Sequence, residues 1–390
     1  MPNPRLRFKK ADGTDYPDWE KKKLGDILTQ RREMQTISEE APLLAFTIED
    51  GVIDPIDKKT NKRDFLIKDK ESKKFQLTKY DDIIYNPANI KFGAIHRNKF
   101  GQGVVSPIYV ILTTDQNPGF LENYFKRKIF LDQTKKYLEG TVEKLRTLKP
   151  ENFLSLSINL PCLEEQEKIA DFLSDIDEFI SLSDQEVKKL QELKKGAMQK
   201  IFSQEIRFKK ADGTDYPDWE EKKLGEVFDI FVGGDIDKKN SSENYSKFYP
   251  YPIFSNSLVN NGLYGYANYY KVNYDCFTVT ARGDIGVAIA RHGCFVPIVR
   301  LLVCKPKNNQ NVNYFSEAVN NAKIYIESTA IPQLTAPQLY NVQVKYPLSL
   351  EEQQKIGDFL SDFDEAISLA KQELEKWKLL KKGLLQQMFT

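Results

Sequence analysis

Two stretches of this 390-residue chain, residues 83–114 and 244–274, combine basic and amide side chains and contain no Asp or Glu. Arg and Lys suit phosphate oxygens and the guanine edge, whereas Asn and Gln suit the adenine edge. The sequence therefore predicts two nucleic-acid-contacting patches; the alternative is that these are solvated loops whose tyrosines belong to the core. The candidate residues in and shortly after the two stretches are Asn86, Lys91, Arg97, Asn98, Lys99, Gln102, Asn256, Asn260, Asn261, Tyr264, Lys271, Arg282 and Arg291.

No pattern in the sequence predicts catalysis or metal binding. The tetrad Asn86-Pro87-Ala88-Asn89 is only faintly similar to the Asn-Pro-Pro-aromatic tetrad of amino-methyltransferases, because the second proline and the aromatic residue are missing. His292 and Cys294 have no third group to orient them, and there is neither a dinucleotide-binding glycine motif nor a phosphate loop. The four cysteines and two histidines lack metal-ligand spacing. We therefore expect no catalytic residue, metal or cofactor in this chain, and a reduced, cytoplasmic setting.

An internal repeat predicts the elements that position the candidate residues. The stretch Arg7–Glu20 recurs letter for letter at Arg207–Glu220, and Leu163–Leu182 returns as Leu350–Leu369 with four changes. These matched flanks enclose two long segments that do not resemble each other in sequence. The pattern predicts a constant frame that carries two different domains.

Each variable segment is followed by a stretch with a heptad pattern. Apolar residues recur at alternating steps of four and three over about five heptads, which predicts two coiled-coil helices. Because each stripe needs a partner and tandem repeats close about a pseudo-two-fold axis, we expect the two helices to pack antiparallel on each other. Ser183, Lys194 and Lys381 interrupt the seam. The predicted partner-binding and coiled-coil positions are Ile169, Leu173, Ile176, Ile180, Val187, Leu190, Ile356, Leu360, Phe363, Ile367, Leu374 and Trp377.

The ends of the frame give three further expectations. Ser349 and Glu352 have the spacing of a capping box, whereas the first helix has Cys162 at the cap and should begin less sharply. The repeated motif Tyr16-Pro17-Asp18-Trp19, which recurs at Tyr216–Trp219, is interpreted as a packing anchor that joins each variable segment to a helix end. By pseudo-symmetry, the N-terminal motif should lie beside Phe389, so that the two chain termini are neighbours.

The predicted fold class is α+β, with two mixed α/β domains joined by two long helices packed as an antiparallel coiled coil in a pseudo-two-fold internal repeat. The expected parts are residues 1–160 and 205–347 for the domains, and 161–204 and 348–390 for the helices. The net charge of +1 implies that a nucleic-acid function rests on local patches, or on a partner that supplies most phosphate contacts. The longest apolar runs are too short to span a membrane, and we expect no membrane association.

Taken together, the repeated motifs resemble the specificity (S) subunit of type I DNA restriction–modification systems over nearly the whole chain. Each variable segment is preceded by Trp…Leu-Gly-Asp/Glu, at Trp19–Asp26 and Trp219–Glu226. Each is followed by Leu-Glu-Glu-Gln…Ile…Leu…Asp, at Leu163–Asp177 and Leu350–Asp364. The ordered set, present twice, is more specific than any one motif. The stretch Ile331–Thr335 is also typical of this family, and Gln333 within it joins the candidate DNA-binding residues.

The resemblance implies two target-recognition domains that each contact one half of a bipartite site in double-stranded DNA, with the coiled coil as a ruler between them. It also implies two methyltransferase (modification) subunits docked on this chain and motor-nuclease (restriction) subunits that join them. S-adenosylmethionine, ATP and Mg²⁺ would belong to those partners, and this chain would not be an enzyme. Two alternatives stay open at this point. A fused restriction or methyltransferase enzyme would need a cofactor-binding glycine motif or an acidic metal cluster, and a coiled-coil scaffold would show no sequence-dependent DNA binding.

Overall fold

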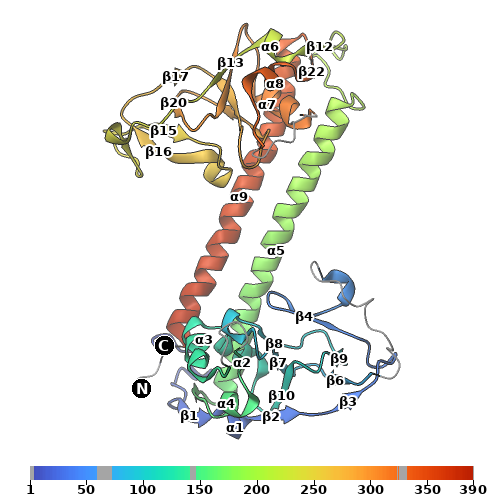
Figure 1. Ribbon diagram of the computed structural model, residues 1–390, viewed down its shortest axis with the longest axis vertical. Coiled ribbons are helices and arrows are strands. Elements are labelled where there is room, and N and C mark those ends of the chain that lie inside the picture. The colour runs from blue at the N-terminus through green and yellow to red at the C-terminus, as the bar shows by residue number, and fades with distance from the viewer. Residues whose placement is uncertain (1–3, 59–72, 141–145, 323, 325–331, 390) are drawn as a thin grey trace. The chain divides into compact units, whose positions relative to one another are not determined.

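The chain forms two units in the computed structural model, which describes residues 4–58, 73–140, 146–322, 324 and 332–389. Unit 1 comprises Met1–Leu182 and Leu374–Thr390, and unit 2 comprises Ser183–Glu373. Each unit contains one α/β domain and a part of each long helix (Figure 1). Because the division crosses both long helices, each helix contributes to both units.

The domain of unit 1 is built on an antiparallel sheet with the strand order β2 (Leu28–Arg31), β10 (Val110–Thr114), β7 (Ile83–Tyr85) and β8 (Ile95–Arg97). Smaller pairings surround it: β1 (Glu20–Lys23) with β11 (Ser157–Leu160), β4 (Ala45–Thr47) with β5 (Gly51–Ile53), and a sheet of β3 (Met34–Gln35), β6 (Phe75–Thr78) and β9 (Gly103–Val105). The helices are α1 (Leu24–Ile27), α2 (Pro118–Phe125), α3 (Lys128–Thr134) and α4 (Pro150–Leu154), with 3-10 turns η1 (Pro55–Asp57), η3 (Ile90–Phe92) and η4 (Lys135–Tyr137).

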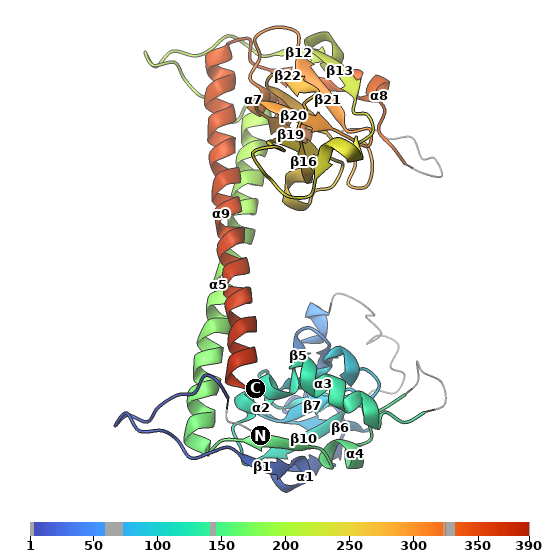
Figure 2. The same cartoon turned by 90° about the vertical axis from the view of Figure 1, so that its left-hand side faces the viewer.

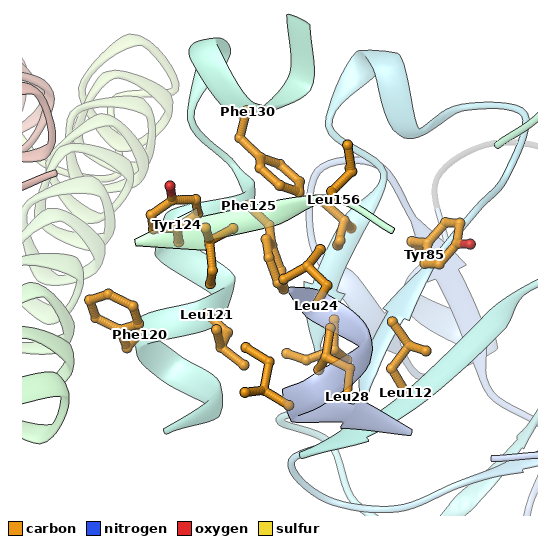
Figure 3. Packing of buried hydrophobic residues seen from close by; sticks show 14 of the residues in the cluster. Leu24, Leu28, Tyr85, Leu112, Phe120, Leu121, Tyr124, Phe125, Phe130 and Leu156 are labelled. Carbon is orange, nitrogen blue, oxygen red and sulfur yellow. The ribbon is translucent and has the colours of Figure 1, made fainter. Parts of the chain in front are cut away.

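Both faces of this central sheet are buried. Alternate residues such as Tyr85 and Leu112 belong to the main core, whereas their neighbours Ile84 and Ile111 belong to a second cluster on the opposite face. This explains why the strands are continuous apolar runs in the sequence instead of alternating ones. Figure 3 shows Leu112 among the main-core residues, while Phe120 on α2 points toward the long helices.

The domain of unit 2 is built on a sheet with the strand order β13 (Phe228–Val232), β21 (Leu302–Pro306), β18 (Cys276–Val279) and β19 (Ala288–Arg291). It also contains β12 (Glu220–Lys223) paired with β22 (Gln343–Tyr346), and a five-stranded sheet of β14 (Ser241–Ser242), β16 (Leu263–Ala267), β15 (Tyr251–Phe254), β20 (Cys294–Pro297) and β17 (Val272–Asn273). Its helices are α6 (Leu224–Val227), α7 (Val312–Asn321) and α8 (Ala336–Tyr340), with 3-10 turns η6 (Lys238–Asn240) and η7 (Val259–Gly262).

The two domains share one frame although their variable segments differ in sequence. The order β2-β10-β7-β8 corresponds to β13-β21-β18-β19, and β1-β11 corresponds to β12-β22. Helices α2 and α7 both begin at an asparagine N-cap, Asn117 and Asn311, whose side chain accepts a backbone N–H bond. The two domains therefore differ mainly in the sheets outside these shared strands.

The long helices are α5 (Leu163–Phe202) and α9 (Leu350–Met388), and the predicted antiparallel pairing is confirmed. In unit 1 the rings of Phe179 and Trp377 stack with centroids 4.8 Å apart, and Lys381 donates to Asp177 at 2.5 Å. In unit 2 Lys194 makes the repeat-equivalent bond to Asp364, at 2.6 Å. The lysines that interrupt the apolar seam are thus satisfied by a carboxylate of the opposite helix.

The predicted seam positions divide into two groups. Ile169 and Leu173 belong to the main core of unit 1, and Ile356 and Leu360 to that of unit 2, so the first turns of each stripe pack on the domains as well. The buried members of the predicted set are Ile169, Leu173, Ile176, Val187, Ile356, Leu360, Ile367 and Leu374. The partly exposed members are Ile180, Leu190, Phe363 and Trp377.

Candidate nucleic-acid interface

The repeated anchor motif is held by one buried carboxylate in each unit. Arg7 donates from Nε and Nη2 to Glu165 at 3.0 and 2.8 Å, and the Trp19 indole donates to the same carboxylate at 3.2 Å. The side chain of Glu165 has 0% exposure. The guanidinium fork and the indole satisfy both of its oxygens, which is the condition under which a buried charge is tolerated.

Unit 2 repeats this arrangement, and it corrects one expectation. Arg207 donates to Glu352 at 3.1–3.3 Å and Trp219 donates at 3.2 Å. The predicted capping box of Ser349 and Glu352 is therefore wrong, because the carboxylate is used by the anchor instead of the helix start. The expected weaker start at Cys162 is also not found, because both helices begin with the same backbone bond, from Gln166 N–H and Gln353 N–H.

The glutamine that follows each of these glutamates ties the domain to the long helix. Gln166 donates to the carbonyl of Pro161 at 2.9 Å and accepts from the Asn117 backbone N–H at 3.1 Å. Gln353 makes the equivalent bonds, to Pro347 and from Asn311. The Glu-Gln pair thus fixes the anchor on one side and the start of α2 or α7 on the other, which gives a physical reason for the repeated sequence.

The predicted neighbourhood of the chain termini is confirmed within unit 1. The Leu6 N–H donates to the Gln387 carbonyl at 3.1 Å, and the Trp19 and Phe389 rings pack edge to face with centroids 6.2 Å apart. Figure 2 shows the end of α9 beside α2. The equivalent pair in unit 2 is Phe202 and Trp219, at 6.3 Å.

The candidate residues of unit 1 leave the sheet at two places. Strands β7 and β8 pair so that Tyr85 faces Ile95 and Ile83 faces Arg97. One end of this hairpin therefore carries Asn86 and Lys91. The other end carries Arg97, Asn98, Lys99 and Gln102. The structure does not join the predicted first patch into one cluster.

Several of these side chains have internal partners. Asn86 accepts from the Ala88 N–H at 3.0 Å, Lys91 lies over the Phe92 ring, and Gln102 donates to the Glu40 carbonyl at 3.1 Å. These bonds order the loops and leave part of each side chain exposed.

Asn98 is a correction to the predicted interface. It has 0% exposure, and its amide donates to Thr78 and to the Gly101 carbonyl at 3.0 and 2.7 Å. Its carbonyl oxygen accepts from the backbone of Phe100 and Gly101. The side chain closes the turn between β8 and β9 and has no surface to offer a base, so we remove it from the interface.

Lys99 belongs to a charge cluster around a buried acid. Glu122 is 5% exposed and faces His96, Lys99 and Lys126 at 3.6, 3.1 and 2.9 Å. Burial opposes the charge, but the hydrogen bond from His96 and the charges of Lys126 and Lys99 hold the pKa of Glu122 well below its usual range.

We expect Glu122→Gln to destabilise unit 1 by about 1.5–3 kcal/mol at neutral pH, and by less as the pH falls. The folded pKa lies below the ordinary value of 4.5, so the carboxylate contributes stability above that value and loses it as the pH falls through the folded pKa. Urea unfolding of wild type and variant between about pH 7 and about pH 3 measures this difference. A difference that stays constant over the range would contradict the role given to Glu122.

In unit 2 the candidates Asn256, Arg282 and Gln333 lie together. Asn256 accepts from the Ala281 N–H at 2.6 Å, and Arg282 donates to Gln333 at 3.4 Å. Tyr264 is 57% exposed, and Lys271 contacts the Asp235 carbonyl at 3.5 Å. Asn260 and Asn261 both adopt positive φ in the turn before β16.

Arg291 is the second correction. It is only 7% exposed, stacks over the Phe254 ring, and donates to Thr278 at 3.1 Å and to the Asn261 carbonyl at 2.6 Å. Burial lowers the pKa of its guanidinium to about 10. Arg291 holds the Asn261 turn in place and is removed from the proposed interface.

One exposed basic residue escaped the sequence analysis. Arg300 lies outside both acid-free stretches, yet it lines the same hollow as Arg282 and Gln333. Little in the sequence indicates its exposure, because VPIVRLLV is predicted as one continuous strand, whereas the structure has a turn between β20 and β21 at Val299 and Arg300.

The residues considered for nucleophilic or metal chemistry have other partners. His292 lies 3.0 Å from Asp275 and 2.9 Å from Asn313. Burial raises the pKa of the Cys276 thiol to about 12, which leaves it protonated. Across the described ranges there is no group of three or more His, Cys, Asp or Glu side chains that could hold a metal ion. Among the same residues no helix has the length and apolar character needed to cross a membrane.

Two α/β domains on a shared frame, anchored to an antiparallel pair of long helices, define the class of this protein as a tandem-repeat α+β chain. The chain belongs to the type I restriction modification DNA specificity domain family, whose pattern matches residues 16–195 and again 216–378. The predicted family and fold class are thereby confirmed.

Individual relatives agree with this membership. A type I specificity subunit of Mycoplasma pneumoniae is 32% identical over 202 residues, which are 52% of this chain and 53% of that protein. This chain therefore matches about half the length of that relative. The MjaX type I restriction enzyme specificity subunit of Methanocaldococcus jannaschii is 26% identical over 98% of this chain and 96% of its own length.

A solved structure shows the same fold. The crystal structure of the type I restriction-modification system S subunit from M. genitalium has a TM-score of 0.66 and 15% sequence identity to this chain. The match covers 100% of this chain and 99% of that one.

Proposed function

We propose that this chain is the non-catalytic DNA-recognition subunit of a type I restriction–modification complex. Each domain contacts one half of a bipartite site in double-stranded DNA, and the paired long helices set the spacer between the halves. The observation that carries this proposal is an identical frame, Glu165 with Gln166 and Glu352 with Gln353, that holds two domains with different outward residues. The identical frames can bind two copies of the same partner subunit, and the two different domains can contact two different half-sites.

The repeated frame also supports two equivalent docking places for methyltransferase subunits, with motor-nuclease subunits joining the complex for cleavage. S-adenosylmethionine, ATP and Mg²⁺ belong to those partners, and the complex works in the cytoplasm. A net charge of +1 is compatible with this role if the partners contribute many of the phosphate contacts. The target base is extruded into a partner's pocket, so recognition and chemistry are carried by different chains.

The proposed interface comprises the candidates whose side chains are at least partly exposed. In unit 1 these are Asn86, Lys91, Arg97, Lys99 and Gln102, and in unit 2 Asn256, Asn260, Asn261, Tyr264, Lys271, Arg282 and Gln333.

We expect Arg282→Ala and Arg97→Ala to weaken DNA binding unequally, although the sequence alone treats the two arginines alike. Arg97 is already paired with Asp81 at 2.5 Å and lies over the Tyr80 ring, so its loss should cost no more than about 1 kcal/mol. Arg282 has no ion pair among the described residues, and its loss should cost about 1–3 kcal/mol if it contacts a base.

Binding of the assembled complex to its own duplex, measured at one fixed salt concentration, gives both values. Equal losses, or wild-type affinity in Arg282→Ala, would refute this assignment. A scaffold without DNA function would show no sequence-dependent binding even for the wild type.

A further inference from the structure

Two arginines of unit 2 converge on one hollow. Arg282 and Arg300 line a cavity of about 210 Å³ together with Gln333 and the apolar side chains of Val232 and Leu334. The Arg282 guanidinium donates to Gln333 Oε1 at 3.4 Å, so the amide lies in the same hollow. The two guanidinium groups and the amide of Gln333 thus place many hydrogen-bond donors around this hollow.

Neither guanidinium has a carboxylate partner in the part of the chain that the structure describes, and both side chains are exposed. The other two arginines of unit 2 are not both exposed and free of a carboxylate partner. Arg207 is bound to Glu352, and Arg291 is buried over Phe254. Two like charges that line one hollow without an internal counter-charge favour an external, electronegative ligand.

The backbone that carries these arginines is held in a defined geometry. Val299 and Arg300 have φ of 55° and 61°, a left-handed conformation that is unfavourable for a β-branched residue. The Asn256 side chain donates to the Val299 carbonyl at 2.6 Å and accepts from the Ala281 N–H at 2.6 Å. One amide therefore fixes the residues next to both arginines, and strain maintained in this way is typical of functional positions.

Equivalent positions in unit 1 can be identified from shared backbone bonds. Leu334 N–H donates to the Ala281 carbonyl at 2.9 Å, and Leu148 N–H donates to the Pro87 carbonyl at 3.0 Å. Each bond lies at the same place relative to the paired strands β18-β21 and β7-β10. Arg282 and Gln333 therefore correspond to Ala88 and Thr147.

A second pair of bonds places Arg300. Leu301 N–H donates to the Ile298 carbonyl at 3.1 Å, just as Tyr109 N–H donates to the Ser106 carbonyl at 3.2 Å. Arg300 therefore corresponds to Ile108, which is 62% exposed. These three structurally equivalent positions carry two arginines and a glutamine in the second domain, and an alanine, an isoleucine and a threonine in the first.

We infer that Arg282 and Arg300 form a guanine-contacting pair in the second domain, with Gln333 in the same hollow, and that these three structurally equivalent positions determine the difference in target between the domains. This inference rests on the proposed function and specifies it. An arginine fork matches the O6 and N7 acceptors of guanine, whereas exposed apolar side chains such as Ile108 suit the thymine methyl group. Base contact is favoured over phosphate contact because Asn256 fixes the backbone beside both arginines, at Ala281 and Val299, and because both arginines line one hollow with the amide of Gln333.

The test uses the full chain assembled with its modification subunits, and a panel of duplexes that carry every single base change in the wild-type site. Arg282→Ala and Arg300→Ala should each lose about 5- to 150-fold of the discrimination at a G·C pair in one half of the site, with the other half unaffected. Arg300→Lys should lose most of the same discrimination, because an ammonium keeps the charge but not the fork. The conservative variant also guards against a folding defect, and Arg5→Ala removes an exposed arginine of the other unit as a matched control.

Each alternative outcome has a distinct meaning. If the alanine variants lose affinity for every duplex equally, with no change in base preference, the inference is overturned. That result, together with near wild-type affinity in Arg300→Lys, would show that the arginines contact phosphates. Wild-type discrimination in all three variants would overturn it as well. A wild-type complex that prefers no sequence would instead contradict the proposed function.

Discussion

Replacing Glu352 with alanine should destabilise unit 2 by about 3–5 kcal/mol, one of the largest effects expected of any single change in this chain. The substitution leaves the guanidinium of Arg207, which is 20% exposed, and the indole of Trp219 without their shared acceptor. Glu165→Ala should have the same effect on unit 1, because its carboxylate is equally buried and makes the same three kinds of bond. Urea unfolding of each variant measures the loss.

Glu351→Ala provides the matched control for Glu352→Ala. Glu351 precedes Glu352 on the same turn, is 57% exposed and pairs with Lys355, so its loss should cost far less stability than the loss of Glu352. Replacing Arg207 and Glu352 together by apolar residues should recover part of the stability, because no buried charge is then left unpaired. Equal costs for the two glutamates would contradict the anchor role.

Replacing residues 226–347 with residues 26–160 should give a chain that recognises a symmetric site, the second largest expected effect. The junction with the long helix is compatible, because Gln353 binds the start of α7 as Gln166 binds the start of α2. The entry junction is compatible, because the Leu224 N–H donates to the Val342 carbonyl as the Leu24 N–H donates to the Leu156 carbonyl. With the same domain on both halves of a pseudo-two-fold frame, the two half-sites should become inverted copies of one sequence.

Selection from a random duplex library by the assembled complex measures this change. The reverse chimera, with residues 226–347 in both positions, is the control and should select the inverted repeat of the other half-site. If either chimera retained the asymmetric wild-type site, the domains would not be the elements that recognise sequence.

The frame was largely predictable from the sequence because it depends on periodic and repeated signals. The heptad stripe gives α5 and α9, and the repeat gives their antiparallel pairing and the contact of Trp19 with Phe389. The role of Glu352 was not predictable, because local spacing suggests a cap. Its use by Arg207, 145 residues earlier in the chain, depends on tertiary packing.

The candidate interface was predictable only in part. Residue type and the absence of acids identify the loops, but they do not determine whether a side chain points outward. Asn98 and Arg291 have the chemistry of DNA-contacting residues and use it to close turns inside their own domains. Arg300 was missed because its exposure follows from the turn between β20 and β21, and its proximity to Arg282 follows from the pairing of the sheet.

The central claim is that an identical frame presents two different sequence-recognising domains. Mapping of methylated bases in DNA from cells that carry the intact system tests it most directly. The account predicts one asymmetric motif in two specific parts separated by a spacer of fixed length and unrestricted sequence. A single uninterrupted motif, or methylation without any sequence preference, would contradict it.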